Sequence, residues 1–323
     1  MKHWLMFGAL GLIWGSSFLL IKIAVVPDGV SAAQSGLLDP LVLVSIRLSL
    51  AALSFLAVVA LTRRKIPTDR KTLISFLVVG LFNNAVPFLL ITWGERTIDS
   101  GLASVLNSTT PLFSLVIAHL ALADDRISLG KIFGLISGFA GVILLATRSI
   151  DPTHPNPLLG QLAVLGAAAS YAAATVYIRH SLRHIDGVVT ASMQLSTAAV
   201  MVVVVTLFTV RPLPVLAAIQ PSAVLAVLVL GLLNTFVAYL LYFSIIHAWG
   251  ATRTTLVTYL MPPIGLVLGA IFESEAIDWK LIVGSGLIVG GVALANLWRG
   301  QLGSAAAPVT APVSAEGVEV TPS

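Results

Sequence analysis

The stretch Gly80-Leu81-Phe82-Asn83 recurs as Gly231-Leu232-Leu233-Asn234, at an offset of 151 residues (231 − 80). Further matching pairs are Leu90 and Leu241, Pro111 and Pro262, Gly134 and Gly284, and Gly141 and Gly291. The chain is therefore a tandem duplication. Each copy carries a proline inside an otherwise apolar segment, and helices interrupted at corresponding places in two halves point to the binding site of a membrane transporter.

The composition is that of an integral membrane protein. Apolar residues make up 57% of the chain and charged residues only 10%, against about 25% charged residues in soluble domains. Spans of about 20 residues cross the hydrocarbon core of a bilayer. Windows of that length predict ten transmembrane helices, at about residues 4–25, 39–61, 72–93, 101–121, 129–147, 158–179, 188–210, 222–246, 253–272 and 279–298.

Each copy of the duplication holds five of these helices. Because five is odd, the second copy enters the membrane in the opposite direction, and the repeats are inverted. The predicted fold is an all-α integral membrane protein, with one five-helix repeat in residues 1–150 and the inverted repeat in residues 151–300. Residues 301–323 are rich in Ala, Pro, Val and Thr, and this low-complexity composition predicts a disordered cytoplasmic tail.

The distribution of positive charge predicts the orientation. With a cytoplasmic N-terminus and ten crossings, twelve lysines and arginines lie inside and five outside, with Arg47 left within a span. The inner set includes the run from Arg63 to Lys71, and the outer set is Lys22, Arg96, Arg148, Arg211 and Lys280. This is the positive-inside bias. Both termini are therefore expected in the cytoplasm of a multi-pass protein.

Several short motifs identify a resemblance. They are Trp14-Gly15-Ser16-Ser17-Phe18, Arg47 early in the second helix, Ser108-Thr109-Thr110-Pro111, and an acidic turn followed nine residues later by glycine, as in Asp125 to Gly134 and Glu275 to Gly284. With them the chain resembles the ten-helix EamA branch of the drug/metabolite transporter superfamily over residues 4 to 298. Asp124-Asp125 departs from the glutamate usual in that turn. The resemblance implies a bacterial inner-membrane carrier that moves small metabolites, often outward.

A polar stripe marks the fourth helix and its counterpart, the ninth. Its members share one helix face in each repeat and are Ser104, Asn107, Ser108 and Pro111, matched by Thr255, Thr258, Tyr259 and Pro262. Each proline frees a carbonyl one turn back, on Asn107 and Thr258. In hydrocarbon such a group must meet protein, water or ligand. The stripe therefore lines a cavity or forms helix-to-helix contacts, since small hydroxylated residues also join membrane helices.

Other candidate binding residues lie inside the predicted spans. Asn83 and Asn234 stand midway along the third and eighth helices, where an amide can bind a substrate or a neighbouring helix. Arg47 either meets an anionic group of the substrate or extends outward to cap carbonyls. Its positional counterpart, Gln194, is uncharged.

Trp14 is the one tryptophan near the centre of a span; the others lie at helix ends, where the membrane interface favours them. It either stacks on an aromatic or apolar substrate or packs within the bundle. Tyr171 is its positional counterpart in the second repeat, and Tyr239 offers a further hydroxyl.

The sequence also lacks the residues of several other functions. It has no cysteine, which excludes disulfides and thiolate metal ligands. No nucleotide loop of the Gly-x-x-x-x-Gly-Lys type is present, and we expect neither cofactor nor metal. An intramembrane enzyme would need a serine with a histidine base or paired acids at mid-depth. All fourteen carboxylates fall in predicted loops or the tail, so no enzyme is predicted.

The sequence thus predicts a secondary transporter that alternates access around a central polar and aromatic cavity. Small metabolites such as amino acids fit its hydroxyls, amides and single arginine, a step that depends mainly on the resemblance. Without an acid at mid-depth, uniport or exchange is favoured over carboxylate-based proton antiport. The alternative is a passive channel or a non-transporting scaffold or receptor. The expected partners are a small-molecule substrate and the lipid bilayer, not nucleic acid, with the chain a monomer or homodimer.

Overall fold

The computed structural model describes residues 1–121, 129–150, 157–210, 219–250 and 254–303. Its elements in the first repeat are α1 (Lys2–Ala24), α2 (Ala32–Ser35), α3 (Pro40–Leu61), α4 (Arg70–Gly80), η1 (Leu81–Ala85), α5 (Val86–Gly94), α6 (Ser100–Asn107), α7 (Thr110–Ala121), α8 (Leu129–Ala146) and η2 (Thr147–Ile150). The second repeat holds α9 (Leu158–Ser181), α10 (Gly187–Thr209), α12 (Pro221–Gly231), η3 (Leu232–Val237), α13 (Ala238–Trp249), η4 (Thr255–Tyr259), α15 (Met261–Phe272) and α16 (Trp279–Gly303). The acidic turn Asp124-Asp125 and most of the predicted tail, 304–323, lie outside the described residues.

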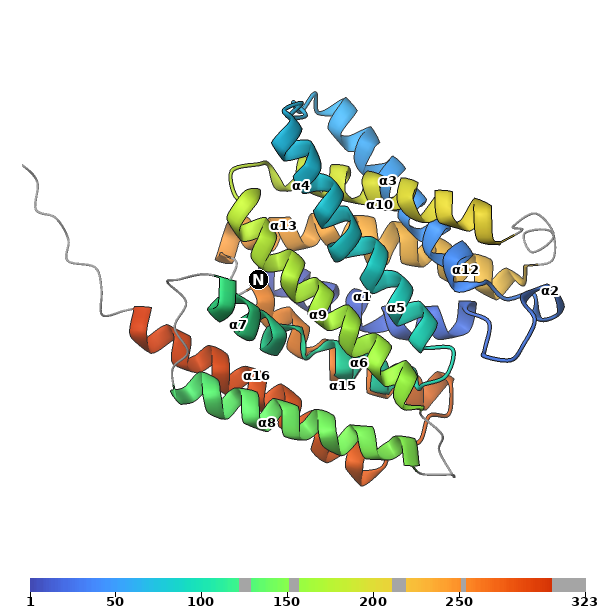
Figure 1. The fold of residues 1–323 in the computed structure, drawn as a ribbon, viewed down its shortest axis with the longest axis vertical. Coiled ribbons are helices and arrows are strands. Elements are labelled where there is room, and N and C mark those ends of the chain that lie inside the picture. Colours follow the sequence, from blue (N-terminus) through green and yellow to red (C-terminus); the bar gives the residue numbers. More distant parts are fainter. Residues whose placement is uncertain (122–128, 151–156, 211–218, 251–253, 304–323) are drawn as a thin grey trace, which may run out of the picture.

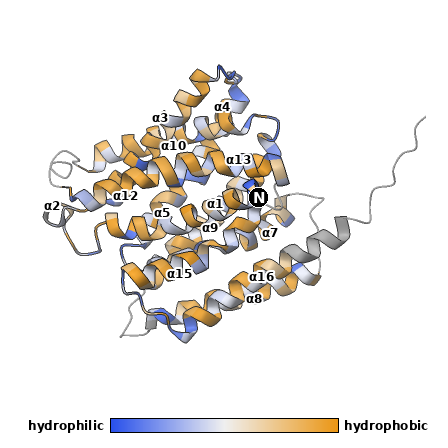
Figure 2. Cartoon of the chain, turned by 180° about the vertical axis from the view of Figure 1, so that it is seen from behind, coloured by the Kyte–Doolittle hydropathy of each residue, from blue (hydrophilic) through white to orange (hydrophobic). Residues whose placement is uncertain are grey.

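The helices have the length and the surface of membrane spans. Within the described ranges, nine spans are long and apolar enough to cross a bilayer, and a tenth apolar helix, Trp279–Ala295, is shorter. Large apolar side chains such as Leu53, Ile143 and Phe208 are exposed on the outside of the bundle. Hydrophilic residues gather at the helix ends and connections (Figure 2). This pattern fits a protein surrounded by lipid, and the predicted all-helical membrane fold is confirmed.

Equivalent helices of the two repeats make equivalent contacts. In Figure 1, α8 and α16 lie side by side along one edge of the bundle, and α3 and α10 lie at the opposite edge. Between these edges, α1 packs on α12, α13 and α15 of the second repeat. Its counterpart α9 packs on α5, α6 and α7 of the first. The repeats are thus interlocked around a pseudo-twofold axis rather than placed side by side.

Contacts between equivalent helices show that the repeats are inverted. Along α3 and α10, Ser45 contacts Thr206 at 2.7 Å between hydroxyls, while Arg64, beyond the other end of α3, pairs with Asp186 at 2.5 Å. Residue numbers rise along one helix as they fall along the other, so α3 and α10 are antiparallel. Two equivalent helices can run in opposite directions only if their repeats cross the membrane in opposite directions.

The α8 and α16 pair is antiparallel as well, and glycine lets the backbones touch. A Cβ on Gly134 would lie 2.5 Å from the Gly291 carbonyl oxygen, and one on Gly141 would lie 2.6 Å from that of Gly284. Gly134 corresponds to Gly284 in the duplication, and Gly141 to Gly291. The pseudo-twofold operation therefore exchanges the two glycine contacts.

The duplicated motif that begins at Gly80 and Gly231 forms a π-helix in both repeats. These are η1 and η3. The Thr235 hydroxyl donates to the carbonyl of Leu230, five residues earlier, at 2.8 Å. Isolated π turns inside α-helices are frequent at functional sites. The sequence analysis predicted ordinary helix here, so the π turns are a new feature of the third and eighth spans.

Candidate functional site

Arg47 lies inside the bundle with most of its hydrogen-bonding capacity unused. Its side chain is buried, at 6% exposure, on α3. Its Nε donates to the Thr235 hydroxyl at 3.0 Å, and its guanidinium carbon lies 4.1 Å from the centre of the Phe88 ring. Neither Nη atom has a hydrogen-bond partner among the described residues. The guanidinium is therefore oriented by Thr235 and Phe88, while its two Nη groups make no hydrogen bond to a described residue.

Two tyrosines lie within electrostatic range of this arginine, and an asparagine contacts one of them. The charge of Arg47 interacts with the hydroxyl groups of Tyr171 on α9 and Tyr239 on α13. The Tyr239 hydroxyl approaches the Asn84 Oδ1 at 3.4 Å, and the Asn84 Nδ2 has no partner although the residue is fully buried. We name Arg47, Asn84, Tyr171, Thr235 and Tyr239 the central polar cluster. It offers unpaired nitrogen donors next to aromatic rings, an environment suited to an anionic group on a partly apolar molecule.

Asn83 and Gln194 form a contact similar to that of Arg47 and Thr235, although the position equivalent to Thr235 is Asn84. The Asn83 Nδ2 donates to the Gln194 Oε1 at 3.1 Å, joining η1 to α10. Arg47 joins α3 to η3 in the same way, with Gln194 at its equivalent position in the second repeat. In both cases the second span of one repeat is linked to the π-helix of the other. In this structure Asn83 contacts a neighbouring helix.

Asn234 and Trp14 connect the second repeat to α1. The Asn234 Nδ2 donates to the Ile13 carbonyl and to the hydroxyls of Ser16 at 3.2 Å and Ser17 at 3.0 Å. Its Oδ1 is buried and has no partner. The Trp14 ring lies 5.4 Å from that of Tyr242, in a tilted arrangement. Trp14 therefore has an aromatic neighbour from α13 and is half-buried, with part of its ring still accessible.

Both predicted helix interruptions have counterparts in the structure. The α6 helix ends at Asn107 and α7 begins at Thr110, just before Pro111. The Thr110 hydroxyl donates to the Asn107 carbonyl at 2.7 Å, which satisfies the group that Pro111 frees. In the second repeat, the 3₁₀ turn η4 precedes α15, whose first turn contains Pro262.

The stripe residues at these breaks use their hydroxyls locally. Ser108 donates to the Val105 carbonyl at 2.6 Å, and Thr258 donates to the Thr255 carbonyl at 2.8 Å. The Asn107 Oδ1 is buried without a partner. Tyr259 lies in η4 and is half-buried. No hydrogen bond within the described part of the chain joins Asn107, Ser108 or Thr258 to Arg47, so the breaks form a second group beside the central polar cluster.

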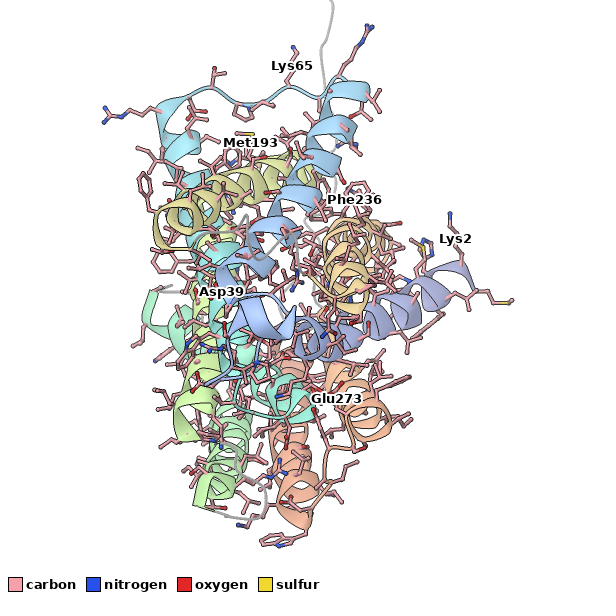
Figure 3. The ribbon with its side chains drawn as sticks, turned by 90° about the vertical axis from the view of Figure 1, so that its right-hand side faces the viewer. Lys2, Asp39, Lys65, Met193, Phe236 and Glu273 are labelled. Atoms are coloured by element: carbon pink, nitrogen blue, oxygen red, sulfur yellow. The ribbon has the colours of Figure 1, made fainter. Side chains whose placement is uncertain are left out.

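Polar contacts tie together one end of the bundle. We name it the outer end; residues 25–39, 95–99 and 273–278 form it, and the charge distribution predicts that it faces outward. Figure 3 looks onto this end, with Asp39 and Glu273 toward the viewer. Here Glu275 accepts hydrogen bonds from the amides of Ser100 at 2.6 Å and Gly101 at 2.8 Å. A carboxylate of the second repeat thus caps the N-terminus of α6 in the first, where the helix dipole favours negative charge.

An arginine and a lysine add to this closure. Arg148 is 1% exposed and pairs with Asp278 at 3.1 Å and Asp99 at 3.5 Å. The Lys22 Nζ donates to the carbonyls of Glu95 and Ile98, both at 2.9 Å. In this structure, the outer end is closed by contacts within the first repeat, made by Lys22, and by contacts between the repeats, made by Arg148 with Asp278 and by Glu275. A hollow of about 360 Å³ opens elsewhere, and its lining is Arg70, Lys71, Ile74, Ser75 and Tyr177.

Sequence reasoning missed part of this arrangement. Asn84 and Thr235 follow the duplicated Asn83 and Asn234, and that adjacency was the available signal. The burial of Glu95 was not expected, because hydropathy places it in a loop. The described residues contain no group of three His, Cys, Asp or Glu side chains that could hold a metal ion.

The EamA-like transporter family model matches residues 2–147 and 158–297, once for each repeat. A relative in Escherichia coli strain K12, named "Uncharacterized inner membrane transporter YedA", is 29% identical over 311 residues, covering 94% of this chain and 93% of the relative. "Uncharacterized transporter YoaV" of Bacillus subtilis strain 168 is 27% identical over 281 residues, covering 87% and 92%.

A solved structure titled "Crystal structure of protein" has the same fold. It aligns with a TM-score of 0.61 at 20% sequence identity, over 93% of this chain and 98% of that one. The likeness extends across both repeats rather than one half.

Proposed function

Because this chain belongs to the EamA-like transporter family, we propose that it is a secondary transporter that carries a small metabolite by alternating access. Interlocked inverted repeats support this mechanism, since rocking one packed unit against another can open either end around a fixed site. The printed name of YedA supports a bacterial inner membrane as the location. The charge distribution supports cytoplasmic termini.

The observation that carries the proposal is the unused guanidinium of Arg47. A charged side chain inside a membrane bundle is costly and is generally found facing a cavity or a partner. Arg47 has no carboxylate partner within the described residues, and its two Nη atoms are free. Arginine binds carboxylates through two parallel N–H donors. We therefore assign Arg47 to the carboxylate of the substrate.

The neighbours of Arg47 narrow the substrate class. The Asn84 Nδ2 can donate to a further oxygen, and the hydroxyls of Tyr171 and Tyr239 lie near the same charge. Outside the central polar cluster, the unpaired Oδ1 atoms of Asn107 and Asn234 can accept from an amine. Such a set suits an amino acid or a similar small amphipathic carboxylate. Trp14, Ser108, Thr258 and Tyr259 are proposed to line the path on either side.

For energy coupling we favour uniport or exchange, with no enzymatic activity. The described spans carry no Asp or Glu at mid-depth, so a carboxylate shared between a substrate and a proton at the centre is lacking. A passive channel or a non-transporting scaffold or receptor is the second candidate. The alternative is tested by the same experiment.

The test is counterflow in proteoliposomes that contain the purified chain. Vesicles loaded with an unlabelled amino acid should accumulate the labelled compound transiently, because an exchanger or uniporter must alternate its site. Across a panel of amino acids and their decarboxylated amines, only compounds with the carboxylate should drive counterflow, since only these engage Arg47 through a charged pair. Equal counterflow with the amines would contradict the Arg47 assignment. Uptake without counterflow would indicate a channel, and no uptake of any compound would favour the scaffold.

A further inference from the structure

The outer end contains a buried carboxyl group that the proposed substrate site does not use. Glu95 follows α5 directly and is 0% exposed. Neither of its carboxyl oxygens has a hydrogen-bond partner, and it forms no ion pair with a described residue. An isolated ionised carboxylate is very costly to bury, and a group in this position normally takes up a proton instead.

The backbone fixes Glu95 in this position. Its amide donates to the Ile91 carbonyl at 2.9 Å, and its own carbonyl accepts from the Lys22 Nζ. At Gly94, the preceding residue, a Cβ would lie 2.8 Å from the Gly160 carbonyl oxygen of α9. The close approach of α9 seals this side. The backbone of Glu95 is therefore held by contacts on both sides, and its side chain is fully buried while the outer end is closed.

The charges that face Glu95 come from three directions. Lys22 approaches from α1, Arg47 from α3 and Glu275 from the connection between α15 and α16. The part of α9 that packs against the preceding residue, Gly94, is Gly160, Ala163 and Val164, which carry no charge. The two positive groups favour the ionised carboxylate and Glu275 opposes it, but burial is the largest influence. Together they raise the pKa of Glu95 well above its usual range.

We infer that Glu95 is a proton-binding site whose occupancy stabilises the closed outer end. In the closed state its carboxyl group is neutral. Opening admits water, so the group ionises and releases its proton to the outside. Because Glu95 lies at the outer end and not at mid-depth, it controls the opening without carrying protons through the membrane. This inference rests on the proposed alternating access, and it leaves uniport or exchange as the mode of transport.

The direction of the pH effect follows from linkage. The closed state has the higher pKa and binds the proton more tightly, so low external pH favours closure. That preference is lost as the pH rises through the raised pKa of the closed state. Between this value and the usual carboxyl pKa of about 4.3, the ratio of closed to open protein changes by up to about tenfold for each pH unit.

The test uses a chain with no cysteine of its own. Thr92→Cys introduces a thiol one helical turn inward of Glu95, at a position that is 0% exposed in the closed state. A charged, membrane-impermeant methanethiosulfonate is added to intact cells at about pH 5.5 and pH 8. The labelling rate is divided by that of Val30→Cys, an exposed position at the same end, which corrects for the ionisation of the thiol.

We expect the corrected rate to rise from the lower to the higher pH, by up to about tenfold for each pH unit that lies between the two pKa values. In the Glu95→Gln background it should be slow at both values, because the amide mimics the protonated acid. Glu95→Asp should keep the pH dependence, and Glu273→Gln, which changes an exposed carboxylate at the same end, should leave it intact. A flat rate in the Thr92→Cys chain, or an unchanged rise in Glu95→Gln, would overturn the inference.

This outcome is separate from that of the transport proposal. Labelling requires no substrate, so the two experiments give separate answers. If labelling depends on pH as predicted but no compound shows counterflow, the transport proposal is contradicted and the proton site is supported. If amino acids show counterflow but labelling does not depend on pH, the transport proposal is supported and the proton site is contradicted. If Glu95→Gln is absent from the membrane, a flat rate in the Thr92→Cys chain still overturns the inference, and Glu95→Ala replaces Glu95→Gln as the variant that must lose the pH dependence.

Discussion

Arg47 and Gln194 occupy equivalent places in the two repeats but differ in what they leave unused. Each extends from the second span of its repeat to the π-helix of the other, Arg47 to Thr235 and Gln194 to Asn83. Gln194 and Asn83 are both neutral amides, and their contact joins two helices. Arg47 makes the same helix-to-helix contact with its Nε alone. The positive charge and the two Nη groups of Arg47 are not needed for this contact between helices.

This difference separates structural roles from functional ones within a duplicated protein. Contacts present in both repeats hold the bundle together, because the pseudo-twofold arrangement needs them twice. A group present in one repeat only breaks that symmetry and has no such structural reason. A substrate that is not symmetric needs a charged binding group in only one repeat. We therefore expect Arg47, and not Gln194, to recognise the substrate.

The largest expected effect is on transport when this asymmetry is removed. Arg47→Gln should lower counterflow by about 100-fold at low substrate concentration, since two charge-assisted hydrogen bonds of about 1.5 kcal/mol each are lost. Gln194→Leu should reduce it by no more than about threefold and cost about 1 kcal/mol of stability, because it unpairs only the Asn83 amide. Proteoliposome counterflow and thermal unfolding measure both. Equal losses in the two variants would show that the pair acts symmetrically.

An intermediate effect should appear where the repeats are symmetric. Gly134→Ala and Gly141→Ala each place a Cβ against a backbone carbonyl oxygen of α16, at 2.5 Å and 2.6 Å. Both should destabilise the folded protein by about 2 kcal/mol through overpacking, and by similar amounts. Gly286→Ala is the matched control, because nothing lies within 4 Å of its Cβ position. Thermal unfolding in detergent measures the three; clearly unequal losses at Gly134 and Gly141 would contradict the symmetry.

The smallest expected effect distinguishes the two duplicated asparagines. Asn234→Ala removes donation to three oxygens on α1, whereas Asn83→Ala removes donation to one on α10. We expect a loss of about 2 kcal/mol for Asn234→Ala and about 1 kcal/mol for Asn83→Ala. Thermal unfolding in detergent measures which of the two variants loses more stability. A greater loss at Asn83 would mean that its contact with Gln194 stabilises the bundle more than the geometry indicates.

The sequence predicted the architecture because bilayer physics constrains it strongly. The thickness of the hydrocarbon core fixes the length of each span, so hydropathy alone located the helices. The offset between Gly80 and Gly231 identified the repeats, and five spans per repeat then required inversion. The exact division of the chain at residue 150 stays a prediction.

The contacts of the site could be predicted less well from the sequence, because they depend on how the helices are rotated against one another. The residues of η1 and η3 read as ordinary apolar helix, and the five-residue contact from Thr235 to Leu230 is a result of packing. Nothing local to Asn234 indicates that its amide meets α1. Glu95 follows a predicted span and reads as a loop residue, yet its side chain is fully buried. The role of each candidate residue in binding stays a prediction.

The glycine contacts between α8 and α16 have a consequence for the evolution of the chain. In the duplication, Gly134 and Gly284 correspond to one position of the repeat, and Gly141 and Gly291 correspond to another. Each contact contains one glycine from each of these positions, Gly134 with Gly291 and Gly141 with Gly284. A substitution at a glycine in either repeat must therefore still fit against the unchanged glycine of the other repeat. The two copies differ at Arg47 and Gln194, but along this seam a substitution in one copy alters a backbone contact with the other.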